Sequence, residues 1–233
     1  MVRSVKPVVS SSGLMAGRRK KLHPTIVRRR PPLFELTAGV LCLDFVNTLD
    51  NRPSGEPKEL LARYGDLLRF AEDTGILAPA QADRLFAWSE ADPDEAQRVL
   101  QATVELREAM YAVFSAVIAK GAVPASALAL LNGYIQLAAQ HVSLTPANGG
   151  FAWRYDNNGD SPGGFETMLW PIVRSAAELL ASDNLPFVRA CSSKTCQWFF
   201  LDTSKNHLRR WCSMKLCGNR AKVRKFYARQ REA

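Results

Sequence analysis

Hydrophobic residues recur along most of the chain at the spacing of three to four residues that is typical of amphipathic helices. This spacing predicts helices over residues 59–70, 79–90, 93–120, 124–140 and 165–180. Shorter apolar runs predict strands at residues 33–36, 142–144 and 151–155, and the last two flank a turn-forming segment, which indicates a hairpin. The apolar run over residues 40–49 fits a helix or a strand. The pattern therefore predicts an α+β fold, with a mainly helical body that contains a few short strands.

Local signals mark the ends of several of these helices. Asp92, Pro93 and Glu95 form a strong helix start, in which Asp92 caps the first turn. Gly121 follows the same helix as a C′ glycine would. Pro171 interrupts the last apolar stripe of the body and predicts a kink or a restart.

The last part of the chain holds a cysteine quartet with the spacing C-x4-C-x15-C-x4-C. Zinc takes four thiolates in a tetrahedron, so this spacing predicts one structural Zn²⁺ ion in a closed site that cannot catalyse. The ligands are Cys191, Cys196, Cys212 and Cys217. Four unrelated buried thiols are the alternative, and two disulfides are disfavoured because we expect no export signal, since no apolar segment of a secretory signal follows the basic start of the sequence.

Three residues near the quartet or outside it have less specific signals. Gly218 follows the last cysteine and can take the left-handed conformation of a tight knuckle. His207 lies between the cysteine pairs and could replace one sulfur, but we expect a surface or phosphate-facing residue. Cys42 lies alone in an apolar run, where a buried core thiol is expected.

The 233-residue chain has a net charge of +9 that is unevenly divided. Residues 1–30 carry +9, residues 31–186 carry −10 and residues 187–233 carry +10. This division predicts a disordered basic arm, which either contacts DNA or is an unconstrained leader, then an acidic body and a zinc-stapled tail. We expect a cytoplasmic protein, because no run approaches the roughly 20 apolar residues of a membrane span.

The tail combines clustered cations with a few apolar residues. We expect Asn219 to cap a basic C-terminal helix whose apolar stripe, Val223, Phe226 and Tyr227, packs on the zinc knuckle. Cations would then face outward and neutralise phosphates. The expected nucleic-acid contacts are Lys205, Arg209, Arg210, Arg220, Lys222, Arg224 and Lys225. We expect the tail aromatics Trp198, Phe199, Phe200 and Trp211 to form a miniature core, although they could also stack on bases.

Nearly the whole tail resembles the CGNR-type zinc finger of bacterial proteins. The resemblance rests on Cys191 to Asn206, with Phe199, Phe200 and Asp202 at their spacing, and on Arg209 to Arg220, which ends in Cys-Gly-Asn-Arg. The body resembles the ABATE domain that precedes this finger, through the run Leu43-Asp44-Phe45-Val46-Asn47-Thr48 and through domain order. The resemblance implies a treble- or knuckle-like finger in a stress-responsive transcription regulator.

The body contains no phosphate loop, nucleophile elbow or other catalytic constellation, so we do not expect an enzyme. Asp44, Asn47 and Thr48 could line a ligand pocket, although helix capping or core hydrogen bonds are favoured. We therefore predict a regulator that binds double-stranded DNA through its finger. Its body would sense a small-molecule effector or form a homodimer. The alternatives are an RNA-binding or ribosome-associated factor and, less favoured, a small-molecule enzyme.

Overall fold

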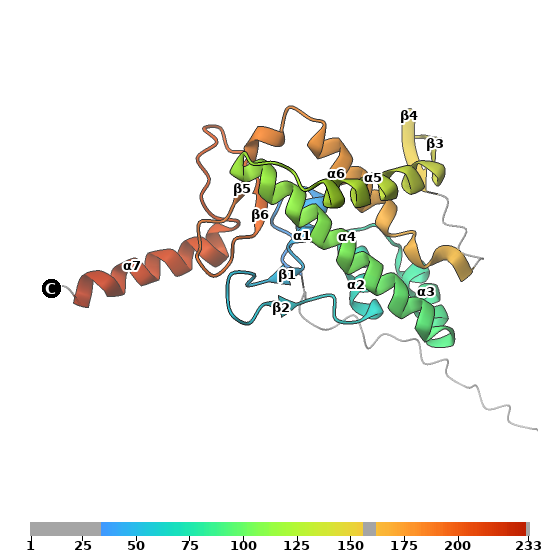
Figure 1. The fold of residues 1–233 in the computed structure, drawn as a ribbon, viewed down its shortest axis with the longest axis horizontal. Helices are drawn as coiled ribbons and strands as arrows, with labels where there is room; N and C mark the ends of the chain where they lie inside the picture. Colours follow the sequence, from blue (N-terminus) through green and yellow to red (C-terminus); the bar gives the residue numbers. More distant parts are fainter. Residues whose placement is uncertain (1–33, 156–161, 232–233) are drawn as a thin grey trace, which may run out of the picture. The chain divides into compact units, whose positions relative to one another are not determined.

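A computed structural model describes residues 34–155 and 162–231 of the chain (Figure 1). The chain divides into two units, Met1–Pro31 and Pro32–Ala233. The expected basic arm over residues 1–30 lies outside the described residues. Among the helices of the described ranges, none is long and apolar enough to cross a bilayer.

The second unit is, as predicted, an α+β structure in which helices dominate. Within the described residues its strands form three antiparallel pairs, β1–β2, β3–β4 and β5–β6, of which only the β3–β4 hairpin was expected. Its elements, in chain order, are α1 (Leu41–Val46), β1 (Leu49–Asp50), β2 (Lys58–Glu59), α2 (Tyr64–Asp73), α3 (Pro79–Ala91), α4 (Pro93–Ala119), α5 (Ala125–Gln140), β3 (Val142–Ala147), β4 (Gly150–Tyr155), the 3₁₀ helix η2 (Pro162–Glu166), α6 (Leu169–Leu180), the 3₁₀ helix η3 (Leu185–Phe187), β5 (Val188–Ala190), β6 (Phe199–Leu201), the π-helical turn η4 (Met214–Gly218) and α7 (Asn219–Arg231).

The long helix α4 begins as predicted but ends differently. The Asp92 carboxylate accepts a hydrogen bond from the Glu95 amide at 3.0 Å, which caps the first turn. At the other end Lys120, rather than Gly121, takes the left-handed conformation, with a φ of 53°. The Gly121 amide then donates to the Ala116 carbonyl at 2.9 Å and closes the last turn.

Two predicted elements near the start are wrong in part. Residues 34–36 do not form a strand. The helix expected from residue 59 begins at Tyr64, because Glu59 is held in β2, where it pairs with Leu49. Its carboxylate accepts hydrogen bonds from the Leu61 amide and from the Arg107 guanidinium, which keeps this segment extended.

The structure decides the segments for which the sequence left the type or extent of the element open. The apolar run over residues 40–49 forms α1 and then enters β1. Pro171 lies in the first turn of α6, so the proline marks a restart after η2 rather than a kink. The predicted hairpin is β3–β4, which is longer than expected and turns at Asn148 and Gly149, both with positive φ.

One hydrophobic cluster joins the body to the tail. It contains α1, α2, α4 and α6 residues of the body together with the four quartet cysteines and the tail aromatics Trp198, Phe199 and Phe200. Tyr111 of α4 stacks on Phe199 with ring centroids 5.1 Å apart. The expected miniature core of the tail is therefore part of a core shared with the body. The domain boundary after residue 186 stays a prediction.

Candidate metal centre and nucleic-acid interface

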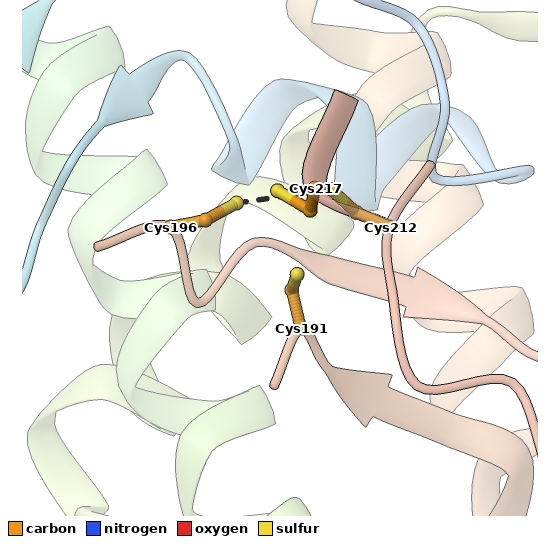
Figure 2. A group of neighbouring side chains, drawn as sticks. All are labelled: Cys191, Cys196, Cys212 and Cys217. Atoms are coloured by element: carbon orange, nitrogen blue, oxygen red, sulfur yellow. Dashed lines mark hydrogen bonds between the residues drawn. The ribbon is translucent and has the colours of Figure 1, made fainter. Parts of the chain in front are cut away.

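The four predicted cysteines converge at the end of β5 and the start of α7. Their sulfur atoms lie within 4.8 Å of one another, and all four residues are buried (Figure 2). The Sγ atoms of Cys196 and Cys212 are 3.7 Å apart, as are those of Cys212 and Cys217. Four thiolates at about 2.3 Å from one tetrahedral ion would lie about 3.8 Å apart, so the spacing fits zinc.

Backbone hydrogen bonds, which do not depend on a metal, shape the two cysteine loops. The Cys191 amide donates to the Trp198 carbonyl at 2.8 Å, and the Cys196 amide donates to the Ser193 carbonyl at 3.1 Å. In the second loop the Gly218 amide donates to the Ser213 carbonyl, also at 3.1 Å. Each loop thus presents its sulfurs inward, as a knuckle does.

The electrostatics of the cluster favour a thiolate, the form that binds metal, at Cys191, whereas the pKa values of Cys196 and Cys212 are raised because these thiols share hydrogen bonds within the cluster. Hydrogen bonds from the thiols of Cys196 and Cys212 lower the pKa of Cys191 well below its usual value. At the second loop, the Arg220 guanidinium donates to the Cys217 sulfur at 3.2 Å. A cation beside a cysteine stabilises its thiolate, so Arg220 supports the metal ligand from the outer shell of the site.

Two residues near the metal have roles that the sequence did not predict. Gly218 does not take the left-handed conformation. A glycine is needed here for lack of space, since an added Cβ would lie 2.7 Å from the Met214 sulfur. His207 is half-buried: its ring stacks on Phe187, with centroids 3.8 Å apart, and its Nδ1 lies 2.8 Å from the Asp202 carbonyl oxygen, so a phosphate contact of this residue stays a prediction.

Comparison with known families agrees with this geometry. The family model named ABATE, described as a putative stress-induced transcription regulator, matches residues 39–183. The chain belongs to the ABATE family. The model of the CGNR zinc finger matches residues 188–230, so the cysteine quartet is a CGNR finger that binds one structural Zn²⁺ ion. Comparison with curated proteins gives no match.

The four residues that name the CGNR finger have distinct structural roles. Cys217 supplies a sulfur, Gly218 gives close packing under Met214, and Arg220 donates to the Cys217 sulfur. Asn219 does not cap α7, because it is already helical and its Nδ2 reaches the Lys215 carbonyl at 3.5 Å. The capping residue is Ser213, whose Oγ accepts from the Leu216 amide at the start of η4. Helix α7 therefore continues directly from the metal loop.

The helix α7 differs from expectation in its apolar side. Val223, Phe226 and Tyr227 are 53–59% exposed, so they do not pack on the zinc knuckle. The neighbouring cations Lys222, Arg224 and Lys225 are exposed as well. Both the apolar and the cationic sides of α7 are thus available to a partner.

The other predicted cations divide into two groups. Lys205 and Arg210 are exposed. The half-buried Arg209 guanidinium instead donates to the carbonyls of Thr37, Trp211 and Cys212 and lies over the Phe200 ring. Arg209 thus ties the CGNR finger to the segment before α1. Its phosphate contact stays a prediction, and these internal bonds disfavour it.

The three weak ligand candidates in ABATE all make structural hydrogen bonds. Asp44 accepts from the Ala38 amide at 2.9 Å, and Thr48 donates to the Phe45 carbonyl at 2.7 Å. The Asn47 carboxamide bonds to both backbone polar groups of Phe199, each at 2.9 Å. These contacts support the favoured alternative, in which the motif serves capping and core hydrogen bonds.

A buried ion-pair network lies beside this motif and was not predicted from the sequence. Arg107 is 1% exposed, and its guanidinium pairs with both oxygens of Glu59 and with Glu108. Burial opposes ionisation of the two carboxyl groups, but the hydrogen bonds from Arg107 and Arg52 lower the pKa of both below its usual value. Only an arginine within a helix otherwise lined by apolar residues could have pointed to it.

A cavity of about 360 Å³ lies beside the sulfurs of the finger. Its lining combines Lys215, Arg220 and Trp198 of the finger with Glu35 and Asp50 of the body. These lining residues include neither a histidine nor a hydroxyl group.

Proposed function

We propose that this ABATE protein is a stress-responsive transcription regulator that binds double-stranded DNA through its CGNR finger and α7. One observation carries the proposal. The cations Lys222, Arg224 and Lys225 are exposed on a helix that is continuous with the zinc-binding turn η4. The metal centre fixes the start of that helix, so the cations are presented from a rigid base.

The dimensions of α7 suit a DNA groove. Thirteen residues form a helix about 20 Å long, and the major groove of B-DNA is about 12 Å wide and admits a helix. Lys222 and Lys225 would neutralise phosphates, while Arg224 could pair with a guanine edge. Exposed Phe226 could contact thymine methyl groups.

Charge separation supports the same orientation. Residues 31–186 carry −10 and would be repelled by phosphates, whereas residues 187–233 carry +10. The ABATE region would then face away from DNA. There it would sense an unidentified small-molecule effector or form a homodimer, in the cytoplasm and without enzymatic activity.

The test is a binding titration at fixed salt concentration, with duplex DNA and structured RNA as separate ligands. We expect the zinc-loaded protein to bind the duplex more tightly and to lose this binding when a chelator removes zinc. Tighter binding to structured RNA would instead favour the RNA-binding alternative. Equal binding before and after verified zinc removal would contradict a role for the finger.

A further inference from the structure

The longest uncharged stretch of the body coincides with its most exposed apolar side chains. Residues 121–153 contain no Asp, Glu, Lys or Arg, although the body as a whole is acidic. The stretch includes α5 and most of the hairpin β3–β4. It supplies six large apolar side chains that are at least 38% exposed: Leu128, Leu130, Leu137, Leu144, Phe151 and Trp153.

The hairpin has an apolar face and a polar face. Leu144 lies opposite Trp153, and Pro146 lies opposite Phe151, so these four side chains project from the same face. The alternate pairs, such as Ser143 with Arg154, project from the other face. Phe151 is the most exposed of the apolar set, at 73%.

The base of the apolar face is anchored, whereas its tip is not. The Arg174 guanidinium of α6 lies 3.7 Å from the centre of the Trp153 ring, which fixes the hairpin against the body. Two strands alone give a marginal sheet in water, and a third strand or a covered face is normally needed. Among the described strands, neither β3 nor β4 has a second partner.

The two strands present different outer edges. Proline cannot donate to a strand ladder, so the backbone nitrogen of Pro146 faces away from β4 and weakens the outer edge of β3. Phe151, directly opposite, is then in a non-hydrogen-bonded pair, and its backbone N–H and C=O face outward from β4. Trp153 follows with the same alternation. Because β4 contains no proline, its outer edge is the one that can pair with a further strand.

We propose that β4 is a homodimerisation edge, where the β4 strands of two copies pair antiparallel about a two-fold axis and form a four-stranded sheet. The proposal rests on the proposed dimerising role of the ABATE region. An antiparallel pair of identical strands is self-complementary, as an isologous interface requires. The two apolar faces then become continuous, and the uncharged surface of α5 lies next along the chain.

The charge distribution favours a second copy of the chain as the partner of the β4 edge. Two acidic bodies repel each other wherever charged surfaces meet, but this stretch brings no acidic group to the interface. Nucleic acid is a poor occupant, because Arg154 is the only cation on the hairpin. The surface thus fits an uncharged partner with a free strand edge, which the same hairpin of another copy provides.

Sedimentation velocity of the full-length, zinc-loaded protein without DNA tests the proposal. We expect the protein to sediment as a dimer at micromolar concentrations. We expect Phe151→Lys to raise the dimer dissociation constant by about 100-fold or more. A substitution counts twice in a two-fold interface and places two like charges near the axis. Leu208→Lys is the matched control, because Leu208 is 77% exposed but lies in the finger, and it should leave the dimer intact.

A second variant, Leu144→Lys, tests the same face from β3 and should weaken the dimer in parallel. Circular dichroism and thermal melting verify that each variant is folded. A monomeric wild-type protein would overturn the proposal, as would a dimer that survives both folded variants. Neither result bears on DNA binding by the finger, which the titration above tests separately.

Discussion

The side chain of Asn47 pairs with both backbone polar groups of Phe199, although 152 residues separate them in the chain. Its Nδ2 donates to the Phe199 carbonyl at 2.9 Å, and its Oδ1 accepts from the Phe199 amide at the same distance. The carboxamide thus acts as a strand neighbour for β6. Because Phe199 lies three residues after the zinc ligand Cys196, this pair ties the body to the metal loop.

Replacing Asn47 with alanine should lower the free energy of unfolding by about 2–3 kcal/mol, because a buried amide and carbonyl of Phe199 lose their partners. Denaturant unfolding measures the change. Asn132→Ala is the control, since Asn132 is exposed on α5, and it should change stability by less than about 0.5 kcal/mol. Equal effects of the two variants would contradict the role of the pair.

Asp44 should make stability depend on pH. Burial, opposed by hydrogen bonds from the amides of Ala38 and Thr37, raises its pKa to about 6. The usual value in an unfolded chain is about 3.9, so its contribution to stability is full below about pH 4 and is lost as pH rises through about 6.

Asp44→Asn keeps an acceptor for the Ala38 amide but cannot ionise. Relative to wild type, the variant should gain about 1–2 kcal/mol of stability between pH 5 and pH 7.5. Thermal melts of both proteins at each pH give this double difference, in which the pH dependence of zinc binding cancels. A stability difference that is the same at both pH values would show that Asp44 does not titrate in this range.

The buried Arg107 should be sensitive even to a substitution of similar length. Arg107→Met leaves the carboxylates of Glu59 and Glu108 without their shared cation, so we expect a loss of about 3 kcal/mol, near the low end for a broken buried pair, because both carboxylates are partly exposed. Denaturant unfolding measures it. Arg98→Met is the control, since Arg98 is largely exposed beside Glu95. A loss no larger than the control's would assign Arg107 to packing alone.

Zinc removal should unfold the finger and destabilise the body, because the four cysteines and Phe199 belong to the core that both parts share. After chelation we expect a change in tryptophan fluorescence, because Trp198 lies in the finger, and a lower melting temperature. Metal analysis should give one zinc per chain before treatment. A chain that carries no zinc under reducing conditions, and is still folded in its tail, would contradict the metal assignment.

Local signals predicted local features well. The cap at Asp92, the Asn148–Gly149 turn and the cysteine quartet all depend on residues close together in sequence or on a strict spacing. The role of Asn47 could not be read in this way, because its partner is the backbone of a distant strand. The hydrogen bonds of Arg209 were likewise hidden, since its partners are carbonyls that any sequence provides.

The apolar stripe of α7 shows a different limit. Periodicity showed that Val223, Phe226 and Tyr227 share one side of a helix, and burial was the natural inference. The structure leaves them exposed, because η4 and α7 form a continuous helical segment that directs α7 away from the knuckle core. Periodicity identifies a face, but it does not identify what covers the face.

The apolar and cationic sides of α7 should contribute differently to DNA binding. Phe226→Ala should weaken binding without changing its salt dependence, because no counterion is released by an apolar contact. Replacing thymine with uracil in the duplex removes the methyl group and should reduce the effect of the variant if Phe226 contacts it. A variant that binds thymine and uracil duplexes as wild type does would place Phe226 outside the interface.

The most direct test of DNA binding by α7 is a titration of duplex DNA against salt concentration, for wild type and for Lys222→Ala combined with Lys225→Ala, with zinc content verified in each. Each phosphate contact contributes about 0.9 to the slope of log K against log salt, so the double variant should flatten the slope by about 2. The metal centre is untouched by this change, and Lys120→Ala, in the body, should leave the slope as in wild type. A double variant with wild-type affinity and an unchanged slope would show that α7 is not the DNA-contacting surface.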